Sequence, residues 1–461
     1  MEQRGLNGSI LESPAWVLAR MTGLAGAGRG IGPVEDSSDR ELVGIKAFVA
    51  GGLPGDLVRA TVIQRKSKFI EGILSELVEP SPHRRIAPCP VVAECGGCDL
   101  QSLRYESQLN LKHEMIVGAF RAARLERETS LVRPFEPSEE GAYRRRFSFH
   151  IDRAGSVGLY RRGSRSVLPL SHCFVATNEV NSVLKKLPLV AEALAGIPAT
   201  AVVESGEGMA GIALVLAEDI SPQRVDTIES VICKLASVWS IRIKDAVVRE
   251  SGGTGMILEV DNRPMPLPLG SFSQINREIN SKLVKRVVEL VMAASASRVL
   301  DLYAGAGNFA IPIASRGVTT TAVELDPELV GAAEPFVRKE GLSIEYRCIS
   351  VEKFLREIGE KEWDCLVVDP PRSGLGSLAS SLPKSQTVLL VSCQLASCVR
   401  DVKALIERGY QVESIEPFDM FAQTSHAEIL SVLRLGDEGQ QGEVGGSGGS
   451  PRRSSAALMS E

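Results

Sequence analysis

The chain has 461 residues, of which 44% are hydrophobic and 24% charged, and its formal net charge is −5. This length exceeds what one hydrophobic core serves and predicts two or three domains, while the negative charge excludes a general polycation. No apolar run reaches the roughly 18 residues of a membrane helix, and the first residues lack the apolar stretch of a secretory signal, so we expect a cytoplasmic monomer outside any membrane.

Residues 16–80 follow a short N-terminal extension, residues 1–15, and contain short alternating apolar runs. Turn residues separate the runs, for example at Gly51-Gly52 and Pro54-Gly55. Alternation with a period of two, interrupted by such turns, is typical of short strands in an all-β unit. We therefore expect a small β-barrel of roughly five strands in this part of the chain.

Residues 81–265 begin with a Pro- and Cys-rich loop, continue with a helix from Tyr105 to about Leu125, and then show mixed strand and helix patterns. Their first part, residues 81–170, holds 15 Lys and Arg against 10 Asp and Glu. Local positive charge can meet the phosphates of RNA, although so mild an enrichment is also found on ordinary surfaces. The candidates for contacting RNA, by charge or by stacking, are Lys66, Lys68, Arg84, Arg85, Tyr143, Arg144, Arg145, Arg146, Phe149 and Tyr160.

Four cysteines have a spacing that predicts a metal site. Cys89, Cys95 and Cys98 lie within ten residues of one loop, and Cys173 follows much later. In a chain without a secretory signal, such cysteines are thiols and not a disulfide framework. A dense group of three with a distant fourth can form a four-thiolate site, which suits an iron–sulfur cluster or zinc. We expect His172, beside Cys173, to be a structural neighbour and not a ligand.

The pattern changes near residue 266, where short apolar strands begin to alternate with helices. Such alternation over residues 266–435 predicts an α/β domain with a largely parallel, Rossmann-like sheet that helices cover on both faces. Residues 436–461 are rich in Gly and Ser, and this composition predicts a disordered tail.

A glycine-rich turn in this domain predicts a cofactor site. The sequence DLYAGAGNF, residues 301–309, follows a strand and leads into a helix, and its glycines allow close approach of the backbone to a ligand. Glu324 ends the next strand, where an acid can accept hydrogen bonds from ribose hydroxyls. Ala310 stands where a pyrophosphate-binding loop has its third glycine. S-adenosylmethionine, which has a ribose but no pyrophosphate, therefore suits the turn better than NAD; a turn that binds nothing is the alternative.

Two reactive residues are expected near the same edge of the sheet. The rigid turn DPPR, residues 369–372, ends one strand in the ligand crevice, and the next strand delivers Cys393 to that edge. Glu428 begins the final strand and can lie there too. A thiolate can act as a nucleophile and a carboxylate as a base, although either residue alone is more often structural. Because only the thiolate reacts, we expect the site to lower the pKa of Cys393.

Together these motifs resemble the RNA uracil-5-methyltransferase family, in particular members with an N-terminal RNA-binding TRAM domain and an iron–sulfur cluster. The matching segments occur in order at 272–276, 301–309, 323–326, 369–372, 391–393 and 418–428, and the barrel and cysteine loop extend the likeness over almost the whole chain. The resemblance implies a class I methyltransferase domain at 266–435, a TRAM-like barrel at 16–80 and a central domain at 81–265 that holds a [4Fe–4S] cluster. It departs at Gln394-Leu395, where the family has Asn-Pro, at Ala422, which replaces Pro, and at Ser350, where a donor-contacting Asn is common.

The resemblance also implies roles for individual residues. Cys393 would add to carbon 6 of uracil, so that carbon 5 can accept the methyl group, and Glu428 would then remove the carbon 5 proton. The RNA would be structured, with 23S rRNA favoured and the T-loop of tRNA as the alternative. The residues implied to bind the methyl donor are Gln274, Tyr303, Asn308, Glu324 and Asp369, and the implied cluster ligands are Cys89, Cys95, Cys98 and Cys173.

Three other functions fit part of the pattern. An N-methyltransferase that uses the DPPR turn would need neither Cys393 nor Glu428. A radical enzyme with an iron–sulfur cluster would carry C-x3-C-x2-C, whereas this chain has C-x5-C-x2-C and a fourth cysteine. An RNA-binding protein that has lost catalysis would not be expected to keep Cys393, Glu428 and Glu324 together.

Overall fold

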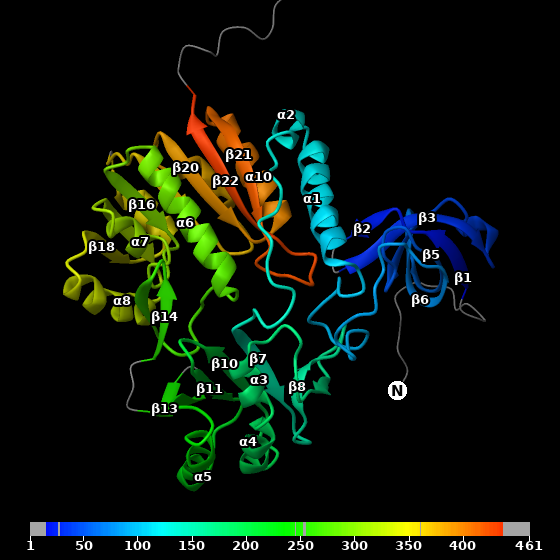
Figure 1. Ribbon diagram of the computed structural model, residues 1–461, viewed down its shortest axis with the longest axis horizontal. Helices are drawn as coiled ribbons and strands as arrows, with labels where there is room; N and C mark the ends of the chain where they lie inside the picture. The colour runs from blue at the N-terminus through cyan, green and yellow to red at the C-terminus, as the bar shows by residue number, and fades with distance from the viewer. Residues whose placement is uncertain (1–14, 26–27, 245, 252–254, 360, 437–461) are drawn as a thin grey trace, which may run out of the picture.

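The computed structural model describes residues 15–25, 28–244, 246–251, 255–359 and 361–436. Among the described residues, three large sheets follow one another along the chain: an N-terminal barrel, a central sheet and a C-terminal sheet (Figure 1). The helix α1 (Tyr105–Ala122) runs between the barrel and the C-terminal sheet. The predicted N-terminal extension and C-terminal tail lie outside the described residues, except Ala15 and Gly436. Among the helices that are described, none is long and apolar enough to cross a membrane.

The barrel closes through five strands in the order β1-β5-β6-β4-β3, because β3 also pairs with β1. Gly32 permits this closure, since a Cβ atom there would lie 1.9 Å from the Arg20 carbonyl oxygen. The five-stranded barrel is thus confirmed, although β3 was not among the apolar runs that predicted it. The strands are β1 (Trp16–Arg20), β2 (Gly23–Ala25), which extends β3, β3 (Arg29–Ser37), β4 (Lys46–Ala50), β5 (Leu57–Arg65) and β6 (Phe69–Glu79), with a short 3-10 helix η2 (Arg40–Leu42).

The central sheet has seven strands in the order β13-β12-β11-β10-β7-β8-β9, and only its β11–β12 pair is parallel. Three helices pack against it around a core that includes Phe147, Phe149 and Leu187. The strands are β7 (Arg146–Ile151), β8 (Val157–Tyr160), β9 (Val167–Pro169), β10 (Ala199–Ser205), β11 (Ala210–Leu216), β12 (Val238–Ile243) and β13 (Ala246–Glu250). The helices are α3 (Asn178–Leu184), α4 (Leu187–Leu194) and α5 (Pro222–Ile232).

The C-terminal sheet has the order β18-β17-β16-β19-β20-β22-β21, with five parallel strands and an antiparallel β22 inserted before β21. Neighbouring strand residues such as Val299 and Leu300 belong to different cores, so helices cover both faces as expected. β18 was not anticipated, because its side chains are only partly buried. The strands are β16 (Arg298–Leu302), β17 (Thr319–Glu324), β18 (Ile344–Cys348), β19 (Cys365–Val368), β20 (Thr387–Ser392), β21 (Tyr410–Phe418) and β22 (Glu428–Leu435).

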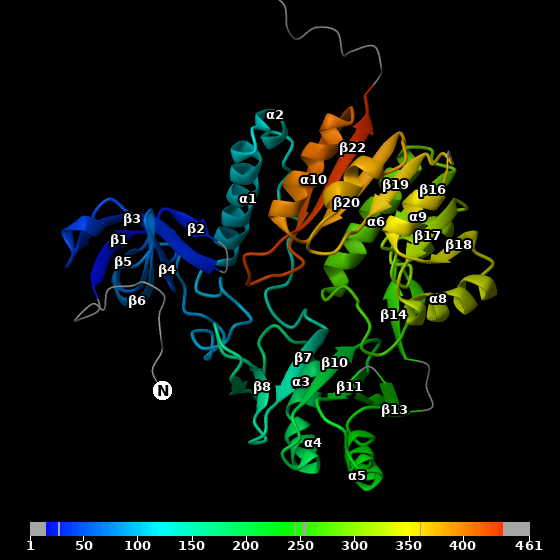
Figure 2. The ribbon, with the colours of Figure 1, turned by 180° about the vertical axis from the view of Figure 1, so that it is seen from behind.

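The helices that cover the C-terminal sheet pack into two hydrophobic cores, one on each face of the sheet. Elements from earlier in the chain contribute to the same cores. α1 lies beside α10 (Figure 2), and its Ile116 and Phe120 pack into the core on that face. The segment after α1 continues along β21, to which Val132 and Glu136 form isolated bridges. The remaining elements are α2 (Glu126–Thr129), the hairpin β14 (Met256–Val260) and β15 (Arg263–Leu267), α6 (Arg277–Ala293), α7 (Ala310–Ala314), α8 (Pro327–Lys339), α9 (Val351–Glu357), η3 (Gly376–Ser381) and α10 (Leu395–Glu407).

Candidate active site

Five of the predicted site residues meet at one edge of the C-terminal sheet. Tyr303 follows β16, Glu324 ends β17, Asp369 follows β19 and Cys393 follows β20, all at the carboxyl ends of parallel strands. Glu428 begins the antiparallel strand β22, so its end of that strand lies at the same edge. Residues that are far apart in sequence are therefore gathered by the topology of the sheet alone.

The register of β20 with β22 brings the two reactive residues together. Ser392 pairs with Ile429, so the next position along the ladder sets Cys393 opposite Glu428. Cys393 is partly exposed, whereas Glu428 is only 2% exposed. The residues that replace Asn-Pro lead directly into α10, for which Gln394 is the N-terminal cap position. The thiol thus stands in the two-residue connection, Cys393 and Gln394, between a buried strand and a helix.

The electrostatic environment of Cys393 differs from our expectation. Burial, followed by the charges of Glu428 and Asp369, raises the pKa of the Cys393 thiol to about 11, while Arg372 opposes the increase. The expected lowering of this pKa is therefore wrong for the protein by itself. The physical reason is that burial disfavours the charged thiolate and that two carboxylates nearby disfavour a further negative charge.

The acids at this edge repel one another as well. Burial raises the pKa of Asp369 to about 7, and burial together with Asp369 raises the pKa of Glu428 well above its usual range. Asp301, at the end of β16, is also fully buried, and its pKa is raised by burial and then by Asp369 and Glu324. Such a group of acids gains by binding a cation. The sequence analysis quoted Asp301 in the glycine-rich motif but did not single it out.

A cavity beside these acids is lined by four of the five residues expected to bind the methyl donor, namely Gln274, Tyr303, Asn308 and Asp369. Tyr303 has a φ of 65°, a left-handed conformation that costs energy in a residue with a side chain and often marks functional turns.

The fifth residue, Glu324, stands directly behind the cavity. Its carboxylate accepts hydrogen bonds from the backbone N–H of Gly305, which lines the cavity, at 2.8 Å, and from those of Leu325 and Asp326. Because a carboxylate has about four acceptor positions, Glu324 can still accept from a ligand.

Two lining residues were not predicted to be part of the site. Phe272 is 66% exposed, which is unusual for an aromatic side chain. Arg145 comes from the central sheet, and its Nε donates to the carbonyl oxygen of Gln274 at 2.8 Å. Arg145 cannot be found from local sequence motifs, because it lies 129 residues before Gln274, to which it donates the hydrogen bond. Exposure of Phe272 is likewise visible only in the folded chain.

Comparisons with known proteins agree with this geometry. Residues 256–434 match the family model described as tRNA (Uracil-5-)-methyltransferase. The chain is 28% identical over 426 residues to the 23S rRNA (uracil(1939)-C(5))-methyltransferase RlmD of Pseudomonas putida, covering 90% of this chain and 92% of that protein. An RNA methyltransferase of Thermotoga maritima is 30% identical over 424 residues, which cover 85% of this chain and 94% of the relative. The chain belongs to the RNA uracil-5-methyltransferase family.

The fold of this methyltransferase is also that of a solved relative. The structure of Pyrococcus abyssi tRNA (uracil-54, C5)-methyltransferase in complex with S-adenosyl-L-homocysteine matches with a TM-score of 0.68 and 23% identity. The match covers 90% of this chain and 99% of the solved chain. The match shows that the two chains share one fold. Membership of the family makes this protein an RNA uracil-5-methyltransferase.

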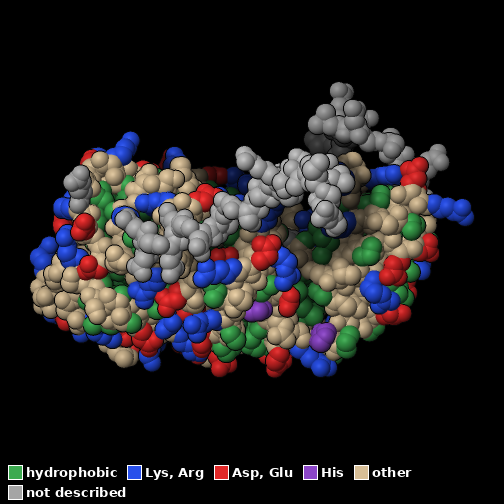
Figure 3. Space-filling model, turned by 90° about the horizontal axis from the view of Figure 1, so that it is seen from above, with side chains coloured by type: hydrophobic (Ala, Val, Ile, Leu, Met, Phe, Trp, Pro, Cys, Tyr) green, Lys and Arg blue, Asp and Glu red, His purple; other side chains and the backbone are tan. Residues whose placement is uncertain are grey.

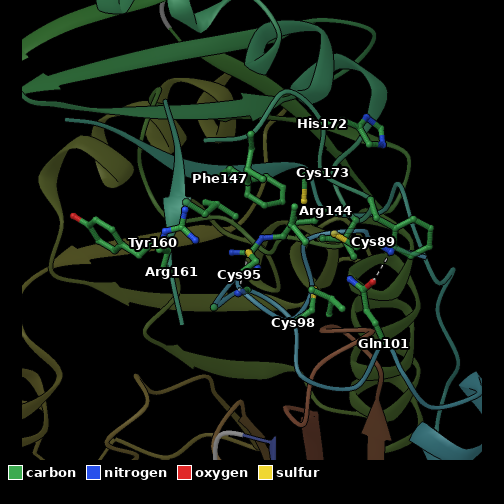
Figure 4. Close-up of a pocket in the computed structure, with 18 of the residues that line it drawn as sticks. Cys89, Cys95, Cys98, Gln101, Arg144, Phe147, Tyr160, Arg161, His172 and Cys173 are labelled. Carbon is green, nitrogen blue, oxygen red and sulfur yellow. Dashed lines mark hydrogen bonds between the residues drawn. The ribbon is translucent and has the colours of Figure 1, made fainter. Parts of the chain in front are cut away.

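The four predicted metal-binding cysteines of the methyltransferase line one cavity of about 300 Å³. Figure 4 shows Cys89, Cys95, Cys98 and Cys173 on different sides of this space. Burial, with Cys173 and Cys95 nearby, raises the pKa of Cys98 to about 12, and the backbone N–H of Gly97 donates to the sulfur of Cys95 at 3.4 Å. Within the described ranges, no three His, Cys, Asp or Glu side chains are grouped closely enough to hold a metal ion.

Several side chains expected to face RNA instead stabilise the fold of the methyltransferase. Arg84 pairs with the fully buried Asp56 at 2.6 Å. Arg145 is 8% exposed and lies 3.5 Å from Glu204. These arginines are held by buried carboxylates, so their charge is already neutralised and they do not form a free basic surface.

Of the aromatic residues expected to stack on bases, two are buried and one is exposed. Phe149 is fully buried, and the Tyr143 hydroxyl donates to the Ala422 carbonyl oxygen, so neither can stack on a base. Tyr160 is 38% exposed and stacks on His150, with ring centroids 3.8 Å apart. Lys66 and Lys68 are exposed. On the uncovered part of the face in Figure 3, Lys and Arg side chains are interspersed with Asp and Glu.

Proposed function

We propose that this methyltransferase transfers a methyl group from S-adenosylmethionine to carbon 5 of one uridine in 23S rRNA, with Cys393 as nucleophile and Glu428 as base. The observation that carries the proposal is the β20–β22 register, which sets these two side chains opposite each other next to a cavity lined by Asp369. An N-methyltransferase would have no use for this pair of residues.

The chain's own groups supply each step of the reaction. S-adenosylmethionine provides, when bound, an electrophilic methyl group on a positively charged sulfur. The Cys393 thiol loses its proton to solvent, and the thiolate forms a bond to carbon 6 of uracil, which moves the electron pair of the 5,6 double bond to carbon 5. Carbon 5 would then use this electron pair to form a bond to the methyl group, while the bond between the methyl group and the donor sulfur breaks and leaves its electron pair on the sulfur. Glu428 removes the remaining carbon 5 proton, the double bond forms again, and the Cys393 thiolate leaves.

The directions of the pKa shifts suit these roles. Glu428 is a stronger base than a solvent-exposed carboxylate, because its pKa is raised. Burial and then the charges of Glu428 and Asp369 keep Cys393 protonated, and the positive charge of a bound donor would oppose the effect of the two carboxylates. Binding of the donor would therefore raise the thiolate fraction above that of the free enzyme.

The methyl donor fits the cavity by its chemistry. We assign Gln274, Tyr303, Asn308, Glu324 and Asp369 to its binding. The donor carries an ammonium and a sulfonium group, and the edge of the sheet presents buried acids that gain by meeting positive charge. A dinucleotide with an anionic pyrophosphate would meet repulsion there. Glu324 already accepts three hydrogen bonds, so of about four acceptor positions it keeps about one for a ribose hydroxyl.

The cysteine-lined cavity suits a [4Fe–4S] cluster. Four thiols around one cavity of about 300 Å³ are the ligand set that such a cluster needs, and a cluster separates its ligands more widely than a single zinc ion does. We propose that Cys89, Cys95, Cys98 and Cys173 bind the cluster and that it has a structural role, since methyl transfer requires no electron.

The choice of RNA follows from the relatives. The RlmD protein of Pseudomonas putida is named for a uracil of 23S rRNA and aligns over 90% of this chain, which favours rRNA. The T-loop of tRNA is the second candidate, because the matching family model is named for tRNA. We propose the barrel at 16–80 as a TRAM-like RNA-binding domain, residues 81–265 as the central domain and 266–435 as the methyltransferase domain. We propose that the enzyme acts as a monomer.

The decisive experiment uses RNA that contains 5-fluorouracil, because fluorine at carbon 5 cannot leave as a proton does and the covalent product accumulates. We expect the enzyme with S-adenosylmethionine to form an adduct that survives denaturing electrophoresis, and Cys393→Ala to form none. Absence of an adduct with the unaltered enzyme would favour the N-methyltransferase. Mapping 5-methyluridine in RNA from cells that lack the protein would distinguish rRNA from tRNA.

A further inference from the structure

The loop that leads to Glu428 is held by residues from distant parts of the chain. We call residues 419–427, between β21 and β22, the base loop. Asp419, Met420, Ala422 and Gln423 in it are fully buried. A buried loop must find partners for its backbone and side-chain polar groups. Those partners come mainly from the cysteine loop and α1, more than 300 residues earlier in the chain.

Among the hydrogen bonds between the cysteine loop and the base loop, those of Asp99 to Ser425 lie nearest to Glu428 in the sequence. The Asp99 carboxylate accepts a hydrogen bond from the backbone N–H of Ser425 at 2.8 Å and one from the Ser425 hydroxyl at 2.7 Å. The backbone N–H groups of Asp99 and Leu100 both donate to the carbonyl oxygen of Gln423, at 3.1 and 3.0 Å. Four hydrogen bonds therefore fasten this segment to the base loop within five residues of Glu428.

The backbone conformation of Gln423 indicates that the base loop needs the hydrogen bonds of its surroundings to keep its shape. Its φ is 68°, a left-handed conformation that is costly for a residue with a side chain and persists only when the surroundings impose it. Its side-chain oxygen accepts from Gln108 at 3.0 Å and from Arg85 at 3.2 Å, and its side-chain nitrogen donates to the Glu140 carbonyl oxygen at 3.1 Å. The strained residue is thus fixed from three directions.

We infer that Asp99 is a positioning residue for the base: by clamping Ser425 it holds the Glu428 carboxylate where it can remove the carbon 5 proton. This inference rests on the proposed function. Only two residues separate Ser425 from Glu428, so a displacement of the former reaches the latter. Cys393 follows β20 and precedes α10, and in the part of the chain that the structure describes Asp99 forms no hydrogen bond with either element. Loss of the clamp should therefore slow proton removal and spare the earlier steps.

The test compares two reactions of the same full-length variants. On 5-fluorouracil RNA, adduct formation reports thiolate addition and methyl transfer. On uracil RNA, turnover also needs Glu428, and a slow base step leaves a covalent methylated enzyme–RNA intermediate. For Asp99→Ala we expect adduct formation within about twofold of the unaltered enzyme, with turnover about tenfold slower and the intermediate accumulating, because small misplacements of catalytic groups are costly.

Asp99→Asn should restore most of the turnover. An amide oxygen can still accept from the Ser425 N–H, and the amide nitrogen can donate to the Ser425 hydroxyl, which serves as donor or acceptor. Ser425→Ala removes one bond from the other side of the contact and should give an intermediate defect. A defect shared by Asp99→Ala and Ser425→Ala would belong to this contact and not to a change in the cysteine loop.

Asp364→Ala is the matched control. Asp364 accepts from the backbone N–H and hydroxyl of Ser297, at 2.7 and 2.8 Å, at the opposite edge of the sheet. Asp364→Ala removes the same kind of clamp far from Glu428. Adduct formation on 5-fluorouracil RNA and turnover of uracil RNA should therefore both remain unchanged.

The outcomes separate this inference from the proposed function. If the unaltered enzyme forms no adduct, the proposed function itself fails. If it forms the adduct and Asp99→Ala turns over uracil RNA normally, or loses both reactions in parallel without an accumulating intermediate, the positioning role is overturned. Should Asp99→Ala fail to fold, the Asp99→Asn and Ser425→Ala pair decides by the same criteria.

Discussion

Lys112 in α1 and Asp419, the first residue after β21, form an ion pair in which Nζ lies 2.5 Å from Oδ1 and both side chains are almost fully buried. The Tyr105 hydroxyl donates to the other carboxylate oxygen at 2.7 Å. Burial lowers the pKa of Lys112, and the charge of Asp419 works against that decrease. The pair therefore ties α1 to the C-terminal sheet at the start of the base loop.

Removing the cation should destabilise the protein strongly. Lys112→Ala leaves the Asp419 carboxylate buried without its counter-ion, and breaking such a pair typically costs about 3–5 kcal/mol. We expect a clear decrease in the urea midpoint of the unfolding transition that includes the C-terminal sheet, followed by circular dichroism. Arg338→Ala removes an exposed helix pair with Glu334 and should shift the midpoint by much less. Equal shifts of the urea midpoint for the two variants would show that burial of the ion pair does not increase its contribution to stability.

Activity should rise with pH through the neutral range. The Cys393 pKa of about 11 means that the reactive thiolate fraction in the free enzyme grows about tenfold per pH unit below that value. Glu428 has a raised pKa and must also be deprotonated, so both groups act in the same direction. The measurement is kcat/KM between about pH 6.5 and 8.5, where a logarithmic slope near 1 is expected. A flat profile, or one that falls above neutrality, would show that Cys393 is already ionised.

Glu324 should contribute directly to affinity for the methyl donor. Glu324→Gln keeps the size of the side chain but removes its charge and one acceptor oxygen, so we expect Kd for S-adenosylmethionine to rise about 10- to 100-fold. Isothermal titration calorimetry measures this value. Glu328→Gln, on the exposed first turn of α8, is the control and should bind normally. An unchanged Kd for Glu324→Gln would remove Glu324 from the donor site.

The cysteine-lined cavity makes a prediction about metal content. Protein purified without oxygen should contain about four iron atoms per chain and absorb visible light near 400 nm, as expected for a four-thiolate cluster. Cys98→Ser should lose most of the iron, because a hydroxyl is a poor replacement for a thiolate ligand. Cys233→Ser, at an exposed cysteine outside the cavity, should retain it. Zinc in place of iron would show that the four cysteines bind a zinc ion and not an iron–sulfur cluster.

Local patterns in the sequence were enough to predict much of the fold. The helix at 105–125, the closed barrel and the strand–helix alternation after residue 266 are all present. Strand β3 was missed because Gly30, Gly32 and Pro33 interrupt its apolar alternation, and β18 because its side chains are partly exposed. Periodicity reports burial, so elements whose burial is irregular leave a weak pattern.

By itself, the sequence determined which residues could react and bind. The glycine turn, the acid that ends the next strand, Cys393 and the four spaced cysteines are readable because each depends on neighbours along the chain. Only the tertiary structure decided the pKa shifts of these residues and the contacts that hold them in place. The raised pKa of Cys393, the neutralised arginines and the Asp99 clamp all arise from charges and hydrogen bonds between residues far apart in sequence. Such contacts depend on distance in space, which no local pattern encodes.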